Sequence, residues 1–107
     1  MTGTELLDIA VSAADDKKAQ EISILDISGQ SSVADYFLVI TGSNKIQTRA
    51  IADSIQDALA EHDVQLFRKQ GYQEGEWILL DYIDVVIHVF LPASREYYQL
   101  ERLWGEA

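Results

Sequence analysis

The chain has 107 residues, with 18 acidic and eight basic side chains, and its formal net charge at pH 7 is -10. This length fits a single domain, and the apolar share of 48% argues against a disordered chain. The negative charge would repel nucleic-acid phosphates and anionic lipids, so both kinds of partner are disfavoured. A basic protein partner is compatible with this negative charge.

The chain has no cysteine. Disulfides, cysteine catalysis, thiolate zinc sites and iron–sulfur clusters are therefore excluded. The amino-terminal residues lack a basic stretch followed by an apolar run, so we expect no signal peptide. The longest apolar run, residues 85–91, is far too short to span a membrane and is interrupted by His88. We expect a cytoplasmic protein.

The first forty residues predict a helix followed by two strands. Residues 2–18 favour a helix, because Thr2 and Glu5 have capping-box spacing and apolar residues recur on one face. Residues 21–27 and 35–41 predict strands that are apolar on both faces. Strands of this kind lie inside a sheet that helices cover on both sides.

The middle of the chain predicts a second helix and a short strand. Asn44 is placed to cap a helix that runs to about residue 62. Residues 64–68 favour a short strand, and residues 71–75 a turn. The passage from strand to helix to strand over residues 35–68 suggests a parallel pair with a right-handed crossover.

The last third predicts a hairpin and a final helix. Residues 77–82 and 84–90 read as two adjacent strands with a tight link, which indicates an antiparallel pair. Pro92 ends the second strand, and Ser94 is placed to cap a helix over residues 94–104. The fold class is therefore α/β: one domain with a single mixed sheet of about five strands flanked by helices.

Two features could carry phosphate chemistry. Thr41-Gly42-Ser43 joins a strand to a helix, where backbone N–H groups can hold a phosphate, but no dinucleotide-binding or P-loop pattern is present. Asp81 and Asp84 could hold Mg²⁺, but residues three apart on a strand do not share a face. We favour an ordinary turn at the first feature and solvent- or partner-facing carboxylates at the second.

His88 interrupts an apolar strand face that it shares with Val86 and Phe90. It could act as a general base or a metal ligand. The only other histidine, His62, is 26 residues away, so we favour a hydrogen-bonded histidine in the core or at an interface. No Gly-x-Ser-x-Gly pattern supports a hydrolase triad.

Aromatic side chains crowd the last third of the chain. They alternate with acidic residues, and tryptophan and tyrosine are common binding hot spots. A helix packed on the sheet and a protein interface both remain open as explanations. The residues are Trp77, Tyr82, Tyr97, Tyr98 and Trp104.

Four segments together resemble one family. The most specific is Trp77-Ile-Leu-Leu-Asp-Tyr-Ile-Asp-Val-Val-Ile-His-Val-Phe, followed by Tyr-x-Leu-Glu-x-Leu-Trp at residues 98–104. With residues 35–43 and 51–53, this resembles the ribosomal silencing factors (the RsfS or Iojap-related family) over about residues 4–104.

The resemblance implies a nucleotidyltransferase-like α/β fold without catalysis, cofactor or metal. It further implies binding to the large ribosomal subunit through ribosomal protein L fourteen, which blocks joining with the small subunit and lowers translation when nutrients are scarce. Ile83 departs from the family, which usually has glycine at this position, so we expect the local turn to differ.

We expect a docking surface in which aromatic side chains anchor the partner and carboxylates meet its lysine and arginine side chains. Two alternatives remain: a Mg²⁺-dependent nucleotidyltransferase using the Gly-Ser turn and paired aspartates, and a homodimeric interaction module. The residues expected to form or support the surface are Trp77, Leu80, Asp81, Tyr82, Asp84, His88, Tyr98 and Glu101.

Overall fold

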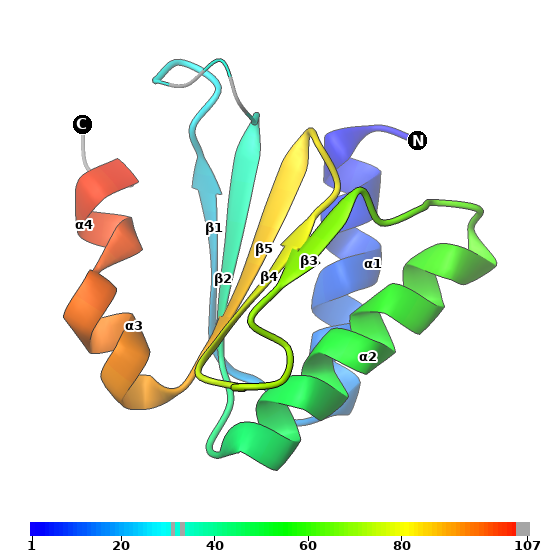
Figure 1. The fold of residues 1–107 in the computed structure, drawn as a ribbon. Helices are drawn as coiled ribbons and strands as arrows, with labels where there is room; N and C mark the ends of the chain where they lie inside the picture. Colours follow the sequence, from blue (N-terminus) through cyan, green and yellow to red (C-terminus); the bar gives the residue numbers. More distant parts are fainter. Residues whose placement is uncertain (31, 33, 105–107) are drawn as a thin grey trace.

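The structure, a computed structural model, describes residues 1–30, 32 and 34–104 (Figure 1). In this part of the chain the strands form one mixed sheet with helices on both faces, as expected from the sequence. The elements are α1 (Gly3–Asp16), β1 (Gln20–Asp26), β2 (Tyr36–Thr41), α2 (Lys45–Glu61), β3 (Arg68–Gln70), β4 (Trp77–Asp81), β5 (Val85–Phe90), α3 (Pro92–Tyr98) and α4 (Leu100–Trp104).

The sheet has five strands in the order β1-β2-β5-β4-β3. Strand β4 pairs antiparallel with β5, which confirms the hairpin. The parallel partner of β2 is β5, so the predicted pairing of β2 with the strand after α2 is wrong. That strand, β3, comprises Arg68–Gln70 instead of residues 64–68, and it lies at the far edge beside β4. Its polar, exposed side chains suit an edge, whereas apolar β5 needs the centre.

Strand β1 also differs from its prediction. Apolar residues on both of its faces suggested an interior strand, but it lies at the other edge of the sheet, paired only with β2 among the described strands. Ile24 is consequently half exposed. A register shift between Gln20 and Ser23 interrupts the ladder there, and such irregularities discourage pairing with another chain.

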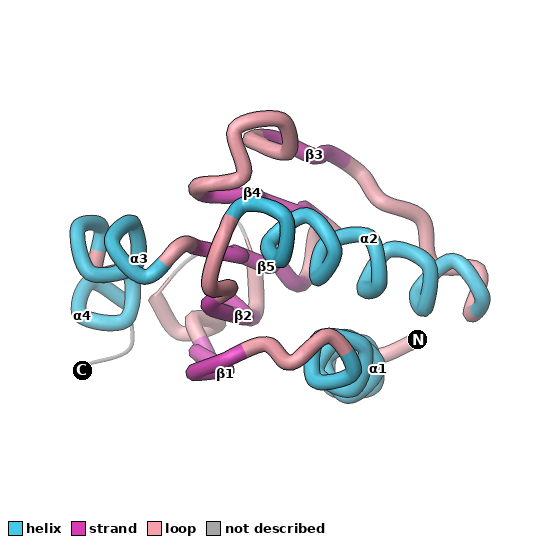
Figure 2. The backbone as a smooth tube through the Cα atoms, turned by 90° about the horizontal axis from the view of Figure 1, so that it is seen from below, coloured by secondary structure: helices cyan, strands magenta, loops and turns pink. Residues whose placement is uncertain are grey.

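Helices α1 and α2 cover one face of the sheet and enclose the main core (Figure 2). The predicted capping box between Thr2 and Glu5 is present at the start of α1. Asn44 caps α2, with its side chain accepting the Gln47 N–H at 2.8 Å. No helix within the described residues has both the length and the apolar character needed to cross a membrane. The core's largest fully buried side chains include Leu38, Ile40, Ile51, Ile55, Leu59, Ile78, Leu80 and Ile87.

Helices α3 and α4 lie on the opposite side of the sheet, and neither has a fully buried residue (Figure 2). The single helix predicted over residues 94–104 is wrong, because Gln99 adopts a left-handed conformation that divides it. The Ser94 cap is wrong as well. Leu91 occupies the capping position without a side-chain bond, and Pro92 supplies the first helical residue, where its missing N–H costs nothing.

Gly71 offers a test of this architecture. Its φ is 76°, and a Cβ at this position would lie 2.0 Å from the Trp77 carbonyl oxygen. We expect Gly71→Ala to lower the free energy of unfolding by about 2 kcal/mol, because it adds both backbone strain and a clash. Gly29→Ala is the control, since its Cβ would meet nothing within 4 Å. Urea unfolding of both variants measures the difference, and equal stabilities would contradict the turn geometry.

Candidate protein-docking surface

The sheet face beneath α3 and α4 is only partly covered, and we call it the open face. Because side chains alternate along a strand, Trp77, Leu79 and Asp81 of β4 all belong to this face. Each of the three is partly exposed. The pairing of β3 with β4 places Arg68 opposite Asp81, which extends the face to the edge of the sheet.

Aromatic rings form a continuous row across the open face. Tyr98 lies 4.5 Å from Trp77, measured between ring centroids. Trp77 in turn contacts His88, and His88 lies 4.7 Å from Phe37. Phe37 then meets Trp104 edge-on at 5.6 Å. The row therefore connects α3, three adjacent strands and α4, and it holds Trp77 and Tyr98 in place while leaving part of each accessible.

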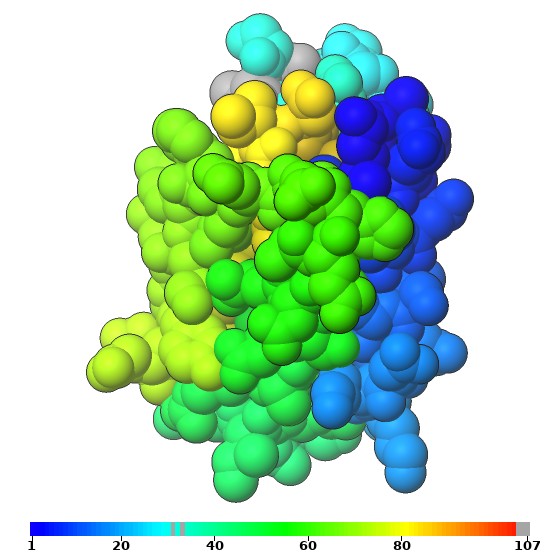
Figure 3. Space-filling model, turned by 90° about the vertical axis from the view of Figure 1, so that its right-hand side faces the viewer, coloured from blue at the N-terminus to red at the C-terminus, as the bar shows by residue number. Residues whose placement is uncertain are grey.

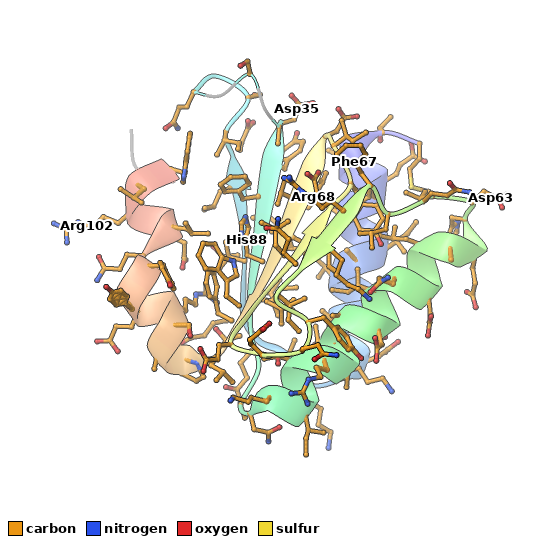
Figure 4. The ribbon with its side chains drawn as sticks, in the orientation of Figure 1. Asp35, Asp63, Phe67, Arg68, His88 and Arg102 are labelled. Carbon is orange, nitrogen blue, oxygen red and sulfur yellow. The ribbon has the colours of Figure 1, made fainter. Side chains whose placement is uncertain are left out.

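His88 lies at the middle of this row (Figure 4) and is only 4% exposed. Its Nδ1 accepts a hydrogen bond from Trp77 Nε1 at 3.0 Å, so its proton is on Nε2. Nε2 has no partner among the described residues. Burial lowers the pKa of His88 to about 4, so the ring is neutral at pH 7. This matches the expected hydrogen-bonded histidine, and its role here is to orient Trp77.

Carboxylates gather at one end of the sheet. Asp81 closes a turn there, because its Oδ1 accepts the Ile83 N–H at 2.8 Å, and its Oδ2 lies 3.5 Å from Arg68. Asp84 is exposed one residue before β5, and its carbonyl accepts the Asp35 N–H at 2.8 Å. We call this the acidic end; its carboxylates are Asp26, Asp35, Asp81 and Asp84.

The structure brings together four of the eight residues expected at the docking surface and adds a fifth at its border. Trp77, Asp81, His88 and Tyr98 share the open face, and Asp84 lies at the acidic end beside it. Four of the five are at least partly accessible through a side chain that can bond or stack with a partner. His88 is buried and supports the surface by bonding Trp77.

The other three residues have different positions. Leu80 and Tyr82 point to the opposite face and belong to the main core, where burial raises the pKa of Tyr82 to about 12. They support the open face from behind. Glu101 accepts a hydrogen bond from Arg95 Nε at 2.9 Å, and this bond lowers the pKa of its carboxyl group. Arg95 also donates to Thr41 and to the Glu21 carbonyl, so Glu101 helps to fix α4 to the sheet.

Three surface residues were missing from the sequence-based set. Leu79 could have been found from alternation, since it lies two residues from both Trp77 and Asp81. Phe37 and Arg68 could not, because they join the face only through the pairing of distant strands.

The geometry does not assemble the nucleotidyltransferase alternative. Gly42 and Ser43 follow the carboxyl end of β2, beside Phe90, whereas Asp84 precedes the opposite end of β5, about 20 Å away along the strands. The Gly42 N–H already bonds the Phe90 carbonyl at 2.9 Å, and the Ser43 N–H bonds Gln47 Oε1. Among the residues that the structure describes, no three histidine, aspartate or glutamate side chains are placed to share a metal ion.

These features define a small mixed α/β protein in which aromatic side chains and carboxylates meet on a partly open sheet face. A family model described as "Ribosomal silencing factor during starvation" matches residues 1–107. The chain is 46% identical over 107 residues to the ribosomal silencing factor RsfS of Bacillus subtilis, covering 100% of this chain and 91% of the relative. The chain belongs to the ribosomal silencing factor (RsfS) family, as its resemblance indicated.

Further relatives agree with this assignment. The RsfS of Halalkalibacterium halodurans is 43% identical over 107 residues, covering 100% of this chain and 92% of the relative. A crystal structure of a protein from Chromobacterium violaceum superposes with a TM-score of 0.96 at 40% identity, covering 100% of this chain and 89% of that one. The family is named for a regulatory role and not for a reaction.

The buried imidazole predicts a pH dependence of stability. The unfolded chain binds a proton at His88 near pH 6.5, whereas the folded chain does so only near pH 4. Stability is therefore lost as the pH falls below 6.5, by about 2 kcal/mol between pH 7 and pH 5. Urea unfolding of the wild type and of His88→Leu at both pH values measures this. A wild-type loss that persists in His88→Leu would show that another group is responsible.

Proposed function

We propose that the protein binds the large ribosomal subunit and prevents it from joining the small subunit, so that translation falls. Membership of the RsfS family supports this, and the family description mentions starvation. A mouse relative, 26% identical over 101 residues, is named "Mitochondrial assembly of ribosomal large subunit protein 1". We further propose that the contact is made through ribosomal protein L fourteen, in the cytoplasm, under nutrient limitation.

The observation that carries the proposal is the combination of aromatic anchors and carboxylates on the open face. Trp77 and Tyr98 are held at a ring distance of 4.5 Å, so little conformational entropy is lost when a partner covers them. Asp81 and Asp84 lie at the border of the same face, where they can meet basic side chains of a ribosomal protein.

The net charge of -10 favours a protein contact over an RNA contact. Ribosomal RNA exposes phosphates, which repel an acidic protein, whereas a basic ribosomal protein attracts it. Blocking by occupancy then requires no catalysed reaction. A bound protein of 12.0 kDa prevents joining if its surface overlaps that of the small subunit.

The first experiment tests binding and blocking together. We expect the purified protein to co-sediment with isolated large subunits and to lower the yield of joined ribosomes when small subunits are added. The readout is a sucrose-gradient profile, with the small subunit alone as the binding control. Co-sedimentation without a lower yield of joined ribosomes would contradict the blocking mechanism and leave the binding intact.

A second experiment tests the charge at the surface. Asp84→Lys should weaken binding to large subunits by about tenfold, because a charge reversal in an interface costs more than 1 kcal/mol. Asp57→Lys is the matched control: Asp57 is also exposed, but it lies on α2 on the other side of the sheet. Both variants have the same net charge. Equal binding by the two would show that overall charge, and not this surface, governs the interaction.

A further inference from the structure

Ile83 has a backbone conformation that is unfavourable for its β-branched side chain. Its φ is 74°, in the left-handed region that favours glycine and that β-branched side chains rarely adopt. The backbone is fixed there by the bond from its N–H to Asp81 Oδ1 at 2.8 Å and by the Tyr82 N–H, which bonds the Val85 carbonyl at 2.9 Å. The side chain is 58% exposed, so internal packing does not compensate for the strain.

Phe67 lies at the same end of the sheet, on the other side of Asp81. Its N–H donates to the Asp81 carbonyl at 2.9 Å, which places it beside the end of β4, and its side chain is 66% exposed (Figure 4). Figure 3 shows the turn after β4, in gold, near the top of the molecule, just below the cyan segment. We call Phe67 and Ile83 the apolar tip.

The surroundings of the tip are acidic. Asp35 and Asp84 are exposed there, Asp26 ends β1 at the same level, and Arg68 is paired with Asp81. The amino terminus, which Figure 1 shows nearby, adds one positive charge. Two copies of the chain meeting at this end would bring their carboxylates together, so charge disfavours self-association and favours a basic partner.

We propose that the apolar tip is a second anchor, which inserts into an apolar hollow edged by lysine or arginine side chains on the protein that the open face binds. This rests on the proposed function, because it places the partner on the large ribosomal subunit. Asp81 joins the two regions: its side chain belongs to the open face, and its carboxylate holds the backbone of Ile83. Strain retained at an exposed apolar residue is accounted for by a contact made outside the chain.

The proposal requires binding to weaken without a loss of stability. Replacing Ile83 with glycine removes the strain but also the anchor. We expect Ile83→Gly to melt at the same temperature as the wild type or up to about 5 °C higher, and to bind large subunits about tenfold more weakly. A residue with a purely structural role would lose stability and binding together.

The experiment compares co-sedimentation and thermal melting of four variants with the wild type. Ile83→Gly and Phe67→Ala each remove one part of the tip, and Ile83→Leu keeps an apolar side chain and should retain binding. Ile46→Ala is the control for general loss of apolar surface, because Ile46 is 78% exposed at the start of α2, at the other end of the molecule.

Weaker binding by Ile83→Gly and Phe67→Ala, with wild-type binding by Ile46→Ala, would support the tip. Wild-type binding by Ile83→Gly and Phe67→Ala would overturn it and leave the proposed function standing. A wild type that does not co-sediment would instead refute the proposed function and the tip with it. Sedimentation velocity adds a separate outcome: a wild-type dimer that Ile83→Gly converts to a monomer would identify a second copy as the occupant and overturn the proposal.

Discussion

The complete burial of β5 is the constraint on which the rest of the molecule depends. All six residues of Val85–Phe90 are buried, so this strand needs a neighbour on each side and a cover on each face. Strands β2 and β4 are the neighbours. Helices α1 and α2, with 14 and 17 residues, cover one face fully, but α3 and α4, with seven and five, cannot do the same for the other. The open face follows from this imbalance.

The polar contacts beneath the short helices make the open face a rigid surface. Arg95 ties α3 to β2 through Thr41 and to α4 through Glu101, which compensates for the lack of fully buried residues in both helices. The neutral imidazole of His88 accepts the Trp77 N–H, so this indole keeps one orientation without a charged partner. An aromatic side chain fixed in this way loses little entropy when it binds.

Local patterns in the sequence predicted most elements, whereas features set by distant contacts were missed. The capping signals at Thr2 and Asn44 are local, and both helices begin where expected. Alternation along β4 would also have separated Leu80 from Trp77, since neighbouring positions point to opposite faces. The parallel partner of β2 was assigned to the wrong strand, because the crossover rule fixes the handedness of the connection and not which later strand lies beside β2. The break at Gln99 was hidden, since glutamine rarely adopts a left-handed conformation.

The two kinds of surface group would have different roles in the proposed complex. Carboxylates at the acidic end act over about a Debye length, so they speed the approach of a basic partner, and salt weakens this effect. The rings of Trp77 and Tyr98 act only on contact, so they determine how long the complex lasts. An acidic molecule with few aromatic anchors would find its partner quickly and leave it as quickly. A factor that blocks by occupancy needs a long residence time, and for that reason the aromatic row, more than the charge, is the part of this surface on which silencing would depend.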